Sequence, residues 1–215
     1  MNRNLTIAGL VGAALTTVSG IIIEAVVKPA SDVSDKMWSY PWTSHSLVPA
    51  SLANAVLHLL VVLGTIAFLQ VMTRRAGRVG GALATAGAVI LFLAEFASLP
   101  IADQRLDETG PQLVGAFFGL GVALTGIGLT VAGIAVLRSP EWTGWQRYAA
   151  LVAGIWSLVM IGVSATSALP VGVAIYGLTL CALFAAVLTQ QPSSATEPRI
   201  SARIESCRYS PAGSC

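Results

Sequence analysis

Residues 24–58 of the chain read EAVVKPASDVSDKMWSYPWTSHSLVPASLANAVLH. The stretch leaves one apolar segment through Glu24, crosses a loop that contains the aromatic sequence WSYPW, and enters a second apolar segment that carries His58. Ionisable groups inside membrane segments are rare and usually functional. The stretch therefore predicts two membrane helices joined by a loop, with a candidate site where the helices meet it.

The composition extends this prediction to the rest of the chain. Of 215 residues, 55% are hydrophobic and only 10% are charged, whereas a soluble domain carries about 25% charged residues. Six apolar runs are each close to the ~20 residues that a helix needs to cross the hydrocarbon core. They span residues 5–27, 48–72, 79–99, 113–137, 145–166 and 171–188. We predict an all-α integral membrane bundle of six transmembrane helices in residues 1–190, with an uncleaved first helix.

The charges predict the orientation of this bundle. With the N-terminus in the cytoplasm, nine basic residues fall on the cytoplasmic side and three fall outside, which is the asymmetry of the positive-inside rule. Both termini are then cytoplasmic, and the long loop 28–47 lies outside the cell (plasma) membrane. Residues 191–215 are rich in Ser and Pro and predict a disordered cytoplasmic tail.

Several classes of function are excluded or weakened by the sequence. A net charge of +2 without a dense basic patch predicts no nucleic-acid partner. The three cysteines have no CxxC spacing and no His/Cys cluster, so we predict neither a metal site nor a bound cofactor. The glycines of residues 115–133 indicate close helix packing rather than a phosphate loop. No internal repeat supports an inverted-repeat transporter.

Three ionisable residues within the apolar runs are the candidate catalytic groups: Glu24, His58 and Glu95. Each lies on a helical stripe of small and polar residues, which is typical of a packed interior face. All three lie at a similar depth, near the extracytoplasmic end. We predict that they converge on one pocket. The alternative is an interhelical ion pair, such as Glu24 with His58, that only fixes the packing.

Aromatic side chains are expected to form the wall of this pocket, because aromatic faces bind cations and apolar ligands. Asn54 lies on the same stripe as His58. The predicted substrate-binding residues are Trp38, Tyr40, Trp42, Asn54, Phe92, Phe96 and Tyr176. For the loop residues, an interfacial aromatic belt is the alternative interpretation.

A carboxylic acid in such a pocket can stay protonated and donate its proton, while aromatic faces stabilise a developing carbocation. Together these groups suit a proton-initiated cyclase or isomerase of a membrane-dissolved isoprenoid. In its size, lone in-membrane acids and aromatic lining, the sequence resembles the small integral-membrane terpene cyclases of fungal meroterpenoid and bacterial indole-terpenoid pathways. With WSYPW after the first helix, it also resembles uncharacterised actinobacterial multi-pass membrane proteins. The first resemblance implies an acidic proton source, here Glu24 or Glu95.

We therefore predict a cyclase that acts on a lipophilic small-molecule substrate. Two alternative functions stay open. A small proton-coupled transporter would use the same three residues as a relay and needs polar residues along a path to the cytoplasm. The inner halves of the helices are instead mostly Ala, Val, Leu and Gly. A non-catalytic membrane subunit is the second alternative. The sequence leaves the oligomeric state and the identity of the substrate open.

Overall fold

The computed structural model describes residues 3–190, and the predicted tail at 191–215 lies outside the described residues. Six long helices make up this part, and each is long and apolar enough to cross a membrane. Their bounds are α1 Arg3–Ile22, α2 Ser44–Val71, α3 Arg75–Ser98, α4 Thr109–Leu137, α5 Gln146–Val163 and α6 Leu169–Thr189. A π-helical turn, η1 (Ile23–Val27), extends α1, and a 3₁₀ turn, η2 (Leu99–Ile101), extends α3. The prediction of an all-α protein with six membrane-length helices is confirmed.

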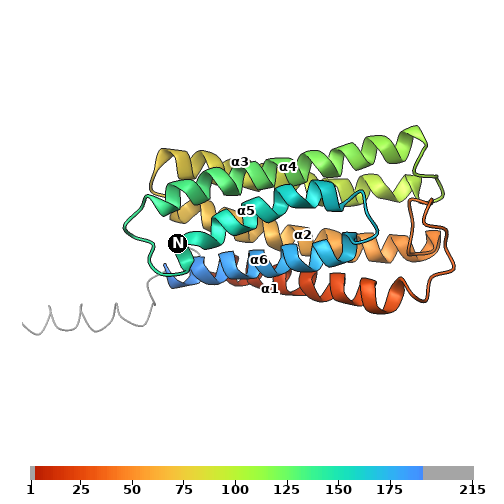
Figure 1. Ribbon diagram of the computed structural model, residues 1–215, viewed down its shortest axis with the longest axis horizontal. Coiled ribbons are helices and arrows are strands. Elements are labelled where there is room, and N and C mark those ends of the chain that lie inside the picture. Colours follow the sequence, from red (N-terminus) through yellow and green to blue (C-terminus); the bar gives the residue numbers. More distant parts are fainter. Residues whose placement is uncertain (1–2, 191–215) are drawn as a thin grey trace, which may run out of the picture.

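The six helices form a closed ring around a common interior. Each helix packs against the next one along the chain, and α6 packs against α1 (Figure 1). Residues 28–43, 102–108 and 164–168 connect helices at one end of the bundle, which we call the loop end. Arg3 and Gln190 lie at the opposite end, which we call the terminal end. The two ends of the described chain therefore lie on the same side, whereas the assignment of that side to the cytoplasm stays a prediction.

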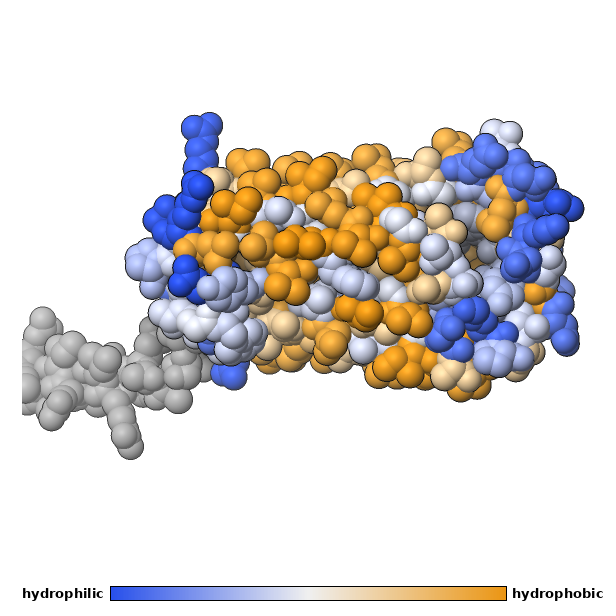
Figure 2. Space-filling model, viewed as in Figure 1, coloured by the Kyte–Doolittle hydropathy of each residue, from blue (hydrophilic) through white to orange (hydrophobic). Residues whose placement is uncertain are grey.

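The flank of the bundle between its two ends is apolar, as Figure 2 shows for one face. Large apolar side chains such as Val56, Leu93 and Leu120 are exposed there. In a membrane protein, lipid chains cover such a surface. The bilayer core contains no water, so apolar side chains can be exposed there without the free-energy cost of contact with water. The exposed flank is consistent with a multi-pass membrane protein.

The interior of the terminal half is filled by large apolar side chains. Fully buried residues come from α2, α4 and α6, and they are Phe68, Leu129, Leu180, Leu183, Phe184 and Val187. Protein interiors pack to the density of organic crystals, so a cluster of this kind leaves little room for a polar passage. Among the described residues, the bundle is therefore closed towards the terminal end.

Glycines allow the closest helix contacts. A Cβ atom built on Gly128 would lie 2.4 Å from the Ala84 amide nitrogen, and one on Gly87 would lie 2.5 Å from the Thr125 amide nitrogen. Only glycine leaves room for the backbones of α3 and α4 at this separation. The predicted packing role holds at these positions. It does not hold at Gly119, which has no neighbour within 4 Å of an added Cβ.

We expect Gly64→Ala to destabilise the bundle by about 1–3 kcal/mol, the usual cost of overpacking a filled core. An added Cβ would lie 2.6 Å from the Phe184 ring and 2.7 Å from Gly9 Cα, which is backbone and cannot move aside cheaply. Gly119→Ala is the matched control, and it should be neutral or slightly stabilising because Ala favours helix. Unfolding of the detergent-solubilised protein in increasing dodecyl sulfate measures both. Equal losses for the two variants would contradict the close approach of α1, α2 and α6.

The first loop is anchored across the loop end by backbone hydrogen bonds. Trp38 N donates to Gln104 O at 2.9 Å, and Leu106 N donates to Lys36 O at 2.9 Å, so the loop pairs with residues 102–108. The loop is shorter than predicted because α2 begins at Ser44 rather than at residue 48. Thr43 caps this helix, since its hydroxyl accepts a hydrogen bond from Ser46 N.

Cysteine labelling tests which end faces outwards. In a chain whose native cysteines are replaced, a cysteine at Asp35 should react with an impermeant maleimide added to intact cells, and one at Ala76 should react only after lysis. Both positions are exposed, whereas Ser39 and Gly77 in the same two connections are buried and unsuitable. Labelling of position 76 in intact cells would reverse the predicted orientation.

Candidate functional site

The imidazole of His58 on α2 meets the carboxylate of Glu95 on α3. The distance from Nδ1 to Oε1 is 3.3 Å, and the side chains are 20% and 9% exposed. Helical side chains lean towards the N-terminus of their own helix, and α2 and α3 run in opposite directions. His58 therefore leans towards the loop end and Glu95 towards the terminal end, which brings the two groups together between apolar helices.

The two atoms lie within ion-pair distance but are not aligned as a hydrogen bond. The Nδ1 atom of His58 is buried and has no hydrogen-bond partner among the described residues. A buried polar atom without a partner is costly. The pair is thus placed to exchange a proton or to accept a further polar group.

Two serines continue the polar contact between α2 and α3 towards the loop end. Ser51 Oγ lies 3.2 Å from Ser98 Oγ, and Ser98 Oγ donates to Glu95 O at 2.6 Å. Both serines are buried. Hydrogen bonds between membrane helices fix their register. The serines therefore hold the backbone of Glu95 opposite α2.

His58 faces the interior of the bundle and is still accessible. It lies on the same stripe of α2 as the buried residues Ser51, Ala55, Val62 and Thr65. A residue on the middle of a buried stripe points away from lipid, yet one fifth of the His58 side chain remains exposed. Asn54, one turn nearer the loop end, is half-buried. Both polar side chains are therefore only partly enclosed by the protein.

Tyr176 on α6 contributes a second unpartnered polar group. It is buried on the interior stripe that continues through Leu180 and Leu183, and its hydroxyl has no hydrogen-bond partner among the described residues. Tyr176 lies about 10 Å from the loop end of α6, at 1.5 Å per residue, in the half of the helix nearer that end.

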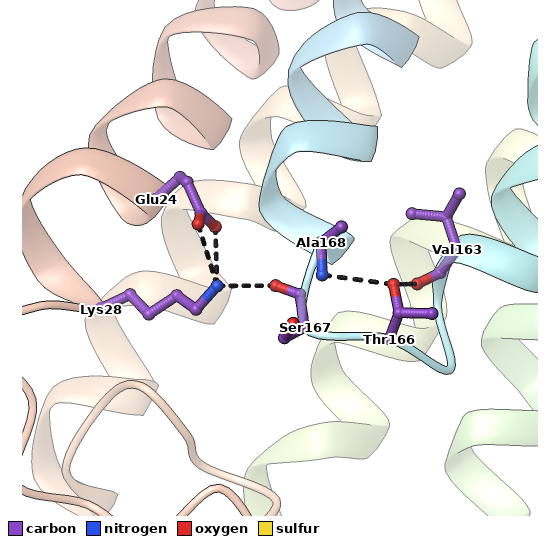
Figure 3. Close-up of polar contacts among 6 residues, drawn as sticks. All are labelled: Glu24, Lys28, Val163, Thr166, Ser167 and Ala168. Carbon is purple, nitrogen blue, oxygen red and sulfur yellow. Dashed lines mark hydrogen bonds and ion pairs between the residues drawn. The ribbon is translucent and has the colours of Figure 1, made fainter.

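Glu24 has a different partner from the one that the sequence suggested. Its two carboxylate oxygens accept from Lys28 Nζ at 2.9 and 3.0 Å, and the same ammonium donates to Ser167 O at 2.7 Å (Figure 3). Glu24 is 35% exposed. Thr166 closes the turn beside this link, because its hydroxyl donates to Val163 O. The glutamate therefore anchors η1 to the α5–α6 connection, and the suggested pair of Glu24 with His58 is not formed.

The predicted aromatic residues fall in separate places. Trp38 lies over Phe118 of α4, with ring centroids 6.4 Å apart. Phe92 and Phe96 form an edge-to-face pair at 5.2 Å, and Phe96 is 44% exposed on the flank. Phe96 therefore lies towards lipid, and Phe92 is half-buried beside it.

The two remaining loop aromatics, Tyr40 and Trp42, are half-buried. Tyr40 precedes a cis peptide bond to Pro41, and Trp42 lines a cavity in the loop. Their substrate-binding role stays a prediction.

The predicted site left out two residues of this end. Phe118 is half-buried on the α4 stripe Val114, Phe118, Gly121, Thr125, which packs against α3 and whose spacing was available as a signal. Lys28 follows Glu24 by four residues, which is the spacing of a helical ion pair. In residues 3–190 no group of three His, Cys, Asp or Glu side chains is placed to hold a metal ion.

The fold and the site together define a class: a bundle of six apolar helices of membrane-spanning length, compatible with a multi-pass membrane protein, with an acid–imidazole pair between α2 and α3. No family model matches the chain, and neither a curated protein nor a solved structure is significantly similar to it.

Proposed function

We propose that the chain is a membrane-embedded acid–base enzyme that cyclises or isomerises an isoprenoid-type lipophilic substrate. The observation that carries the proposal is the Glu95–His58 pair, whose Oε1 and Nδ1 atoms lie 3.3 Å apart on interior faces of two apolar helices. A carboxylic acid and an imidazole within reach of one another provide a proton donor and a proton acceptor in the same site. Water-poor surroundings protect the cationic intermediates of such a reaction.

The proposed reaction needs no co-reactant. Glu95 gives its proton to the substrate, and the double bond that accepts the proton leaves a carbocation on the neighbouring carbon. A second double bond of the substrate attacks this centre and closes a ring. Loss of a proton from the adjacent carbon to His58 forms the final double bond, and transfer from His58 to Glu95 restores the enzyme. The product is an isomer of the substrate.

Aromatic rings suit the charge of the intermediate. The rings of Phe118, which is half-buried, and Tyr176, which is buried, offer negative π-density to a cation. Trp38 covers Phe118 from the loop. In this proposal Asn54 orients the substrate, and the rings of Phe92 and Phe96 flank its entry from the bilayer. Glu24, already paired with Lys28, serves as a structural anchor.

The test uses purified protein in liposomes. It is incubated with plain and epoxidised prenylated aromatic substrates, and the extracts are analysed for cyclised products of unchanged mass. Products that form only with intact protein support the proposal. Substrates that are recovered unchanged in every case, under conditions where the protein is folded, would refute it.

A proton-coupled transporter is the second candidate, because it would use the same intramembrane pair. The closed terminal half of the bundle favours the enzyme, since a pocket open at one end suffices for catalysis and transport needs access to both. A pH-sensitive dye trapped inside the liposomes separates the two. Substrate-driven acidification that requires Glu95 would establish transport instead.

A further inference from the structure

A second candidate site lies at the loop end, away from Glu95 and His58. A cavity of about 310 Å³ opens between the end of η1 and the start of α2. Its walls come from η1, from the first loop and from the first turn of α2, and they are Val26, Val27, Ala30, Ser31, Asp32, Val33, Pro41, Trp42, Thr43 and Ser46. Neither member of the acid–imidazole pair lines it. The volume lies at the small end of the range for small-molecule sites.

The lining has the chemistry of a site for an organic cation. Asp32 supplies the one charged side chain, Trp42 supplies an indole face, and valine, alanine and proline supply apolar walls. No basic residue lines the cavity. Carboxylates attract cations. Among the aromatic side chains, Trp binds an ammonium group most strongly with the face of its ring. Apolar walls favour a cation that carries methyl or methylene groups over a hydrated metal ion.

The other polar groups of the cavity already have partners. Ser31 Oγ accepts from Val33 N at 3.2 Å, and Thr43 Oγ1 lies 2.8 Å from Ser46 Oγ and caps α2. These hydroxyls hold the loop in shape and leave the carboxylate as the main polar group for a ligand.

Asp32 lacks a cationic partner of its own. None of the ion pairs within residues 3–190 includes it. Two basic residues lie four positions from it in the sequence: Lys28 is held by Glu24 and by Ser167 O, and Lys36 forms no ion pair with Asp32. The negative charge at the cavity is therefore not neutralised by the protein, and a ligand cation can neutralise it.

We propose that this cavity binds an alkylammonium group, with the Asp32 carboxylate as counter-ion and the Trp42 indole against its methyl or methylene groups. The group can belong to a free small molecule or to the headgroup of a lipid, since η1 and the loop meet at the edge of the apolar flank. This proposal is independent of the proposed enzymatic function.

Choline binding to the full-length protein tests the site. The protein is held in maltoside micelles, whose headgroups carry no ammonium, and choline is titrated at constant ionic strength against sodium chloride while saturation-transfer NMR records the bound fraction. We expect saturable binding of choline. Asp32→Asn should weaken it about fivefold, as expected for an exposed ion pair, and Trp42→Leu should weaken it about threefold to fivefold.

Asp35→Asn is the matched control. Asp35 is an exposed acid of the same loop, three residues further along, and does not line the cavity. Its loss should leave choline binding unchanged. The proposal is overturned if replacing sodium by choline at constant ionic strength gives no saturable binding signal. It is also overturned if the Asp35 and Asp32 variants weaken choline binding equally.

Two nanodisc preparations identify the source of the ammonium group. Weaker choline binding in phosphatidylcholine discs than in discs of an uncharged galactolipid, whose surface likewise carries no net charge, shows that the lipid headgroup occupies the cavity. Equal choline binding in both shows that the site takes the free cation. Loss of activity in the liposome assay bears on the proposed enzyme alone, so the two proposals fail separately.

Discussion

Glu95→Gln is expected to lower the turnover of an isoprenoid-type substrate by about 10²–10⁴-fold, the usual contribution of a general acid. Glutamine has nearly the same volume and keeps an oxygen that can face His58, but it has no proton to give. The hydrogen bond from Ser98 reaches the main-chain oxygen of residue 95 and survives the change. The measurement is the rate of cyclised product formation per mole of folded protein, with gel filtration and thermal unfolding to show that the fold is intact.

Glu24→Gln is the control that the structure offers for this experiment. The sequence assigned both glutamates the same catalytic role, whereas the structure holds Glu24 in a half-buried ion pair with Lys28. Because Glu24 pairs with neither His58 nor Glu95, the rate of this variant per mole of folded protein should stay close to the wild-type rate. The reverse outcome, a lost rate with Glu24→Gln and a normal rate with Glu95→Gln, would move the proton source to α1.

The helices were predictable because hydropathy reports directly on lipid contact. Six apolar runs were enough to predict six helices of membrane length. Their ends were less predictable, because a helix can extend beyond the hydrocarbon core into polar sequence. In α2 the cap at Thr43 starts the helix before the apolar run begins, and Pro49 fits within its first turns.

The site was predictable in part. Stripes of small and polar residues identified the interior faces of His58 and Glu95, and the structure brings these two together. The stripe that contains Glu24 did not decide its partner, because Lys28 lies four residues away and forms the pair locally. The loop cavity had no signal in the sequence. Its shape depends on the path of the first loop and on local hydrogen bonds of Ser31 and Thr43, and no periodic pattern specifies those.

The Phe92–Phe96 pair shows a further limit of sequence reasoning. Both residues flank Glu95 in the sequence, which suggested a common wall. In a helix, neighbours in sequence are about 100° apart, so Phe96, directly after Glu95, points away from it, whereas Phe92, three residues before Glu95, stays near the same face. Phe96 accordingly lies on the flank, Phe92 is half-buried, and a third ring, Phe118, comes from another helix.

Phe184→Ala is expected to destabilise the bundle by about 3–5 kcal/mol, the cost of removing a buried aromatic ring and leaving its cavity. Phe184 is fully buried, and its ring contacts the α1–α2 crossing at Gly64 and Gly9. Three helices therefore lose a common contact when it is removed. Reversible unfolding in mixed dodecyl sulfate micelles gives the change in the free energy of unfolding.

Phe96→Ala makes the same chemical change on the lipid-facing flank and is its matched control. Because detergent or lipid chains contact this exposed ring in the folded protein, they can fill the space that it leaves, and the loss should be below about 1 kcal/mol. Similar losses for the two variants would show that the terminal half is loosely packed. A loosely packed terminal half would remove the argument for a pocket open at one end, and with it the reason to prefer an enzyme over a transporter.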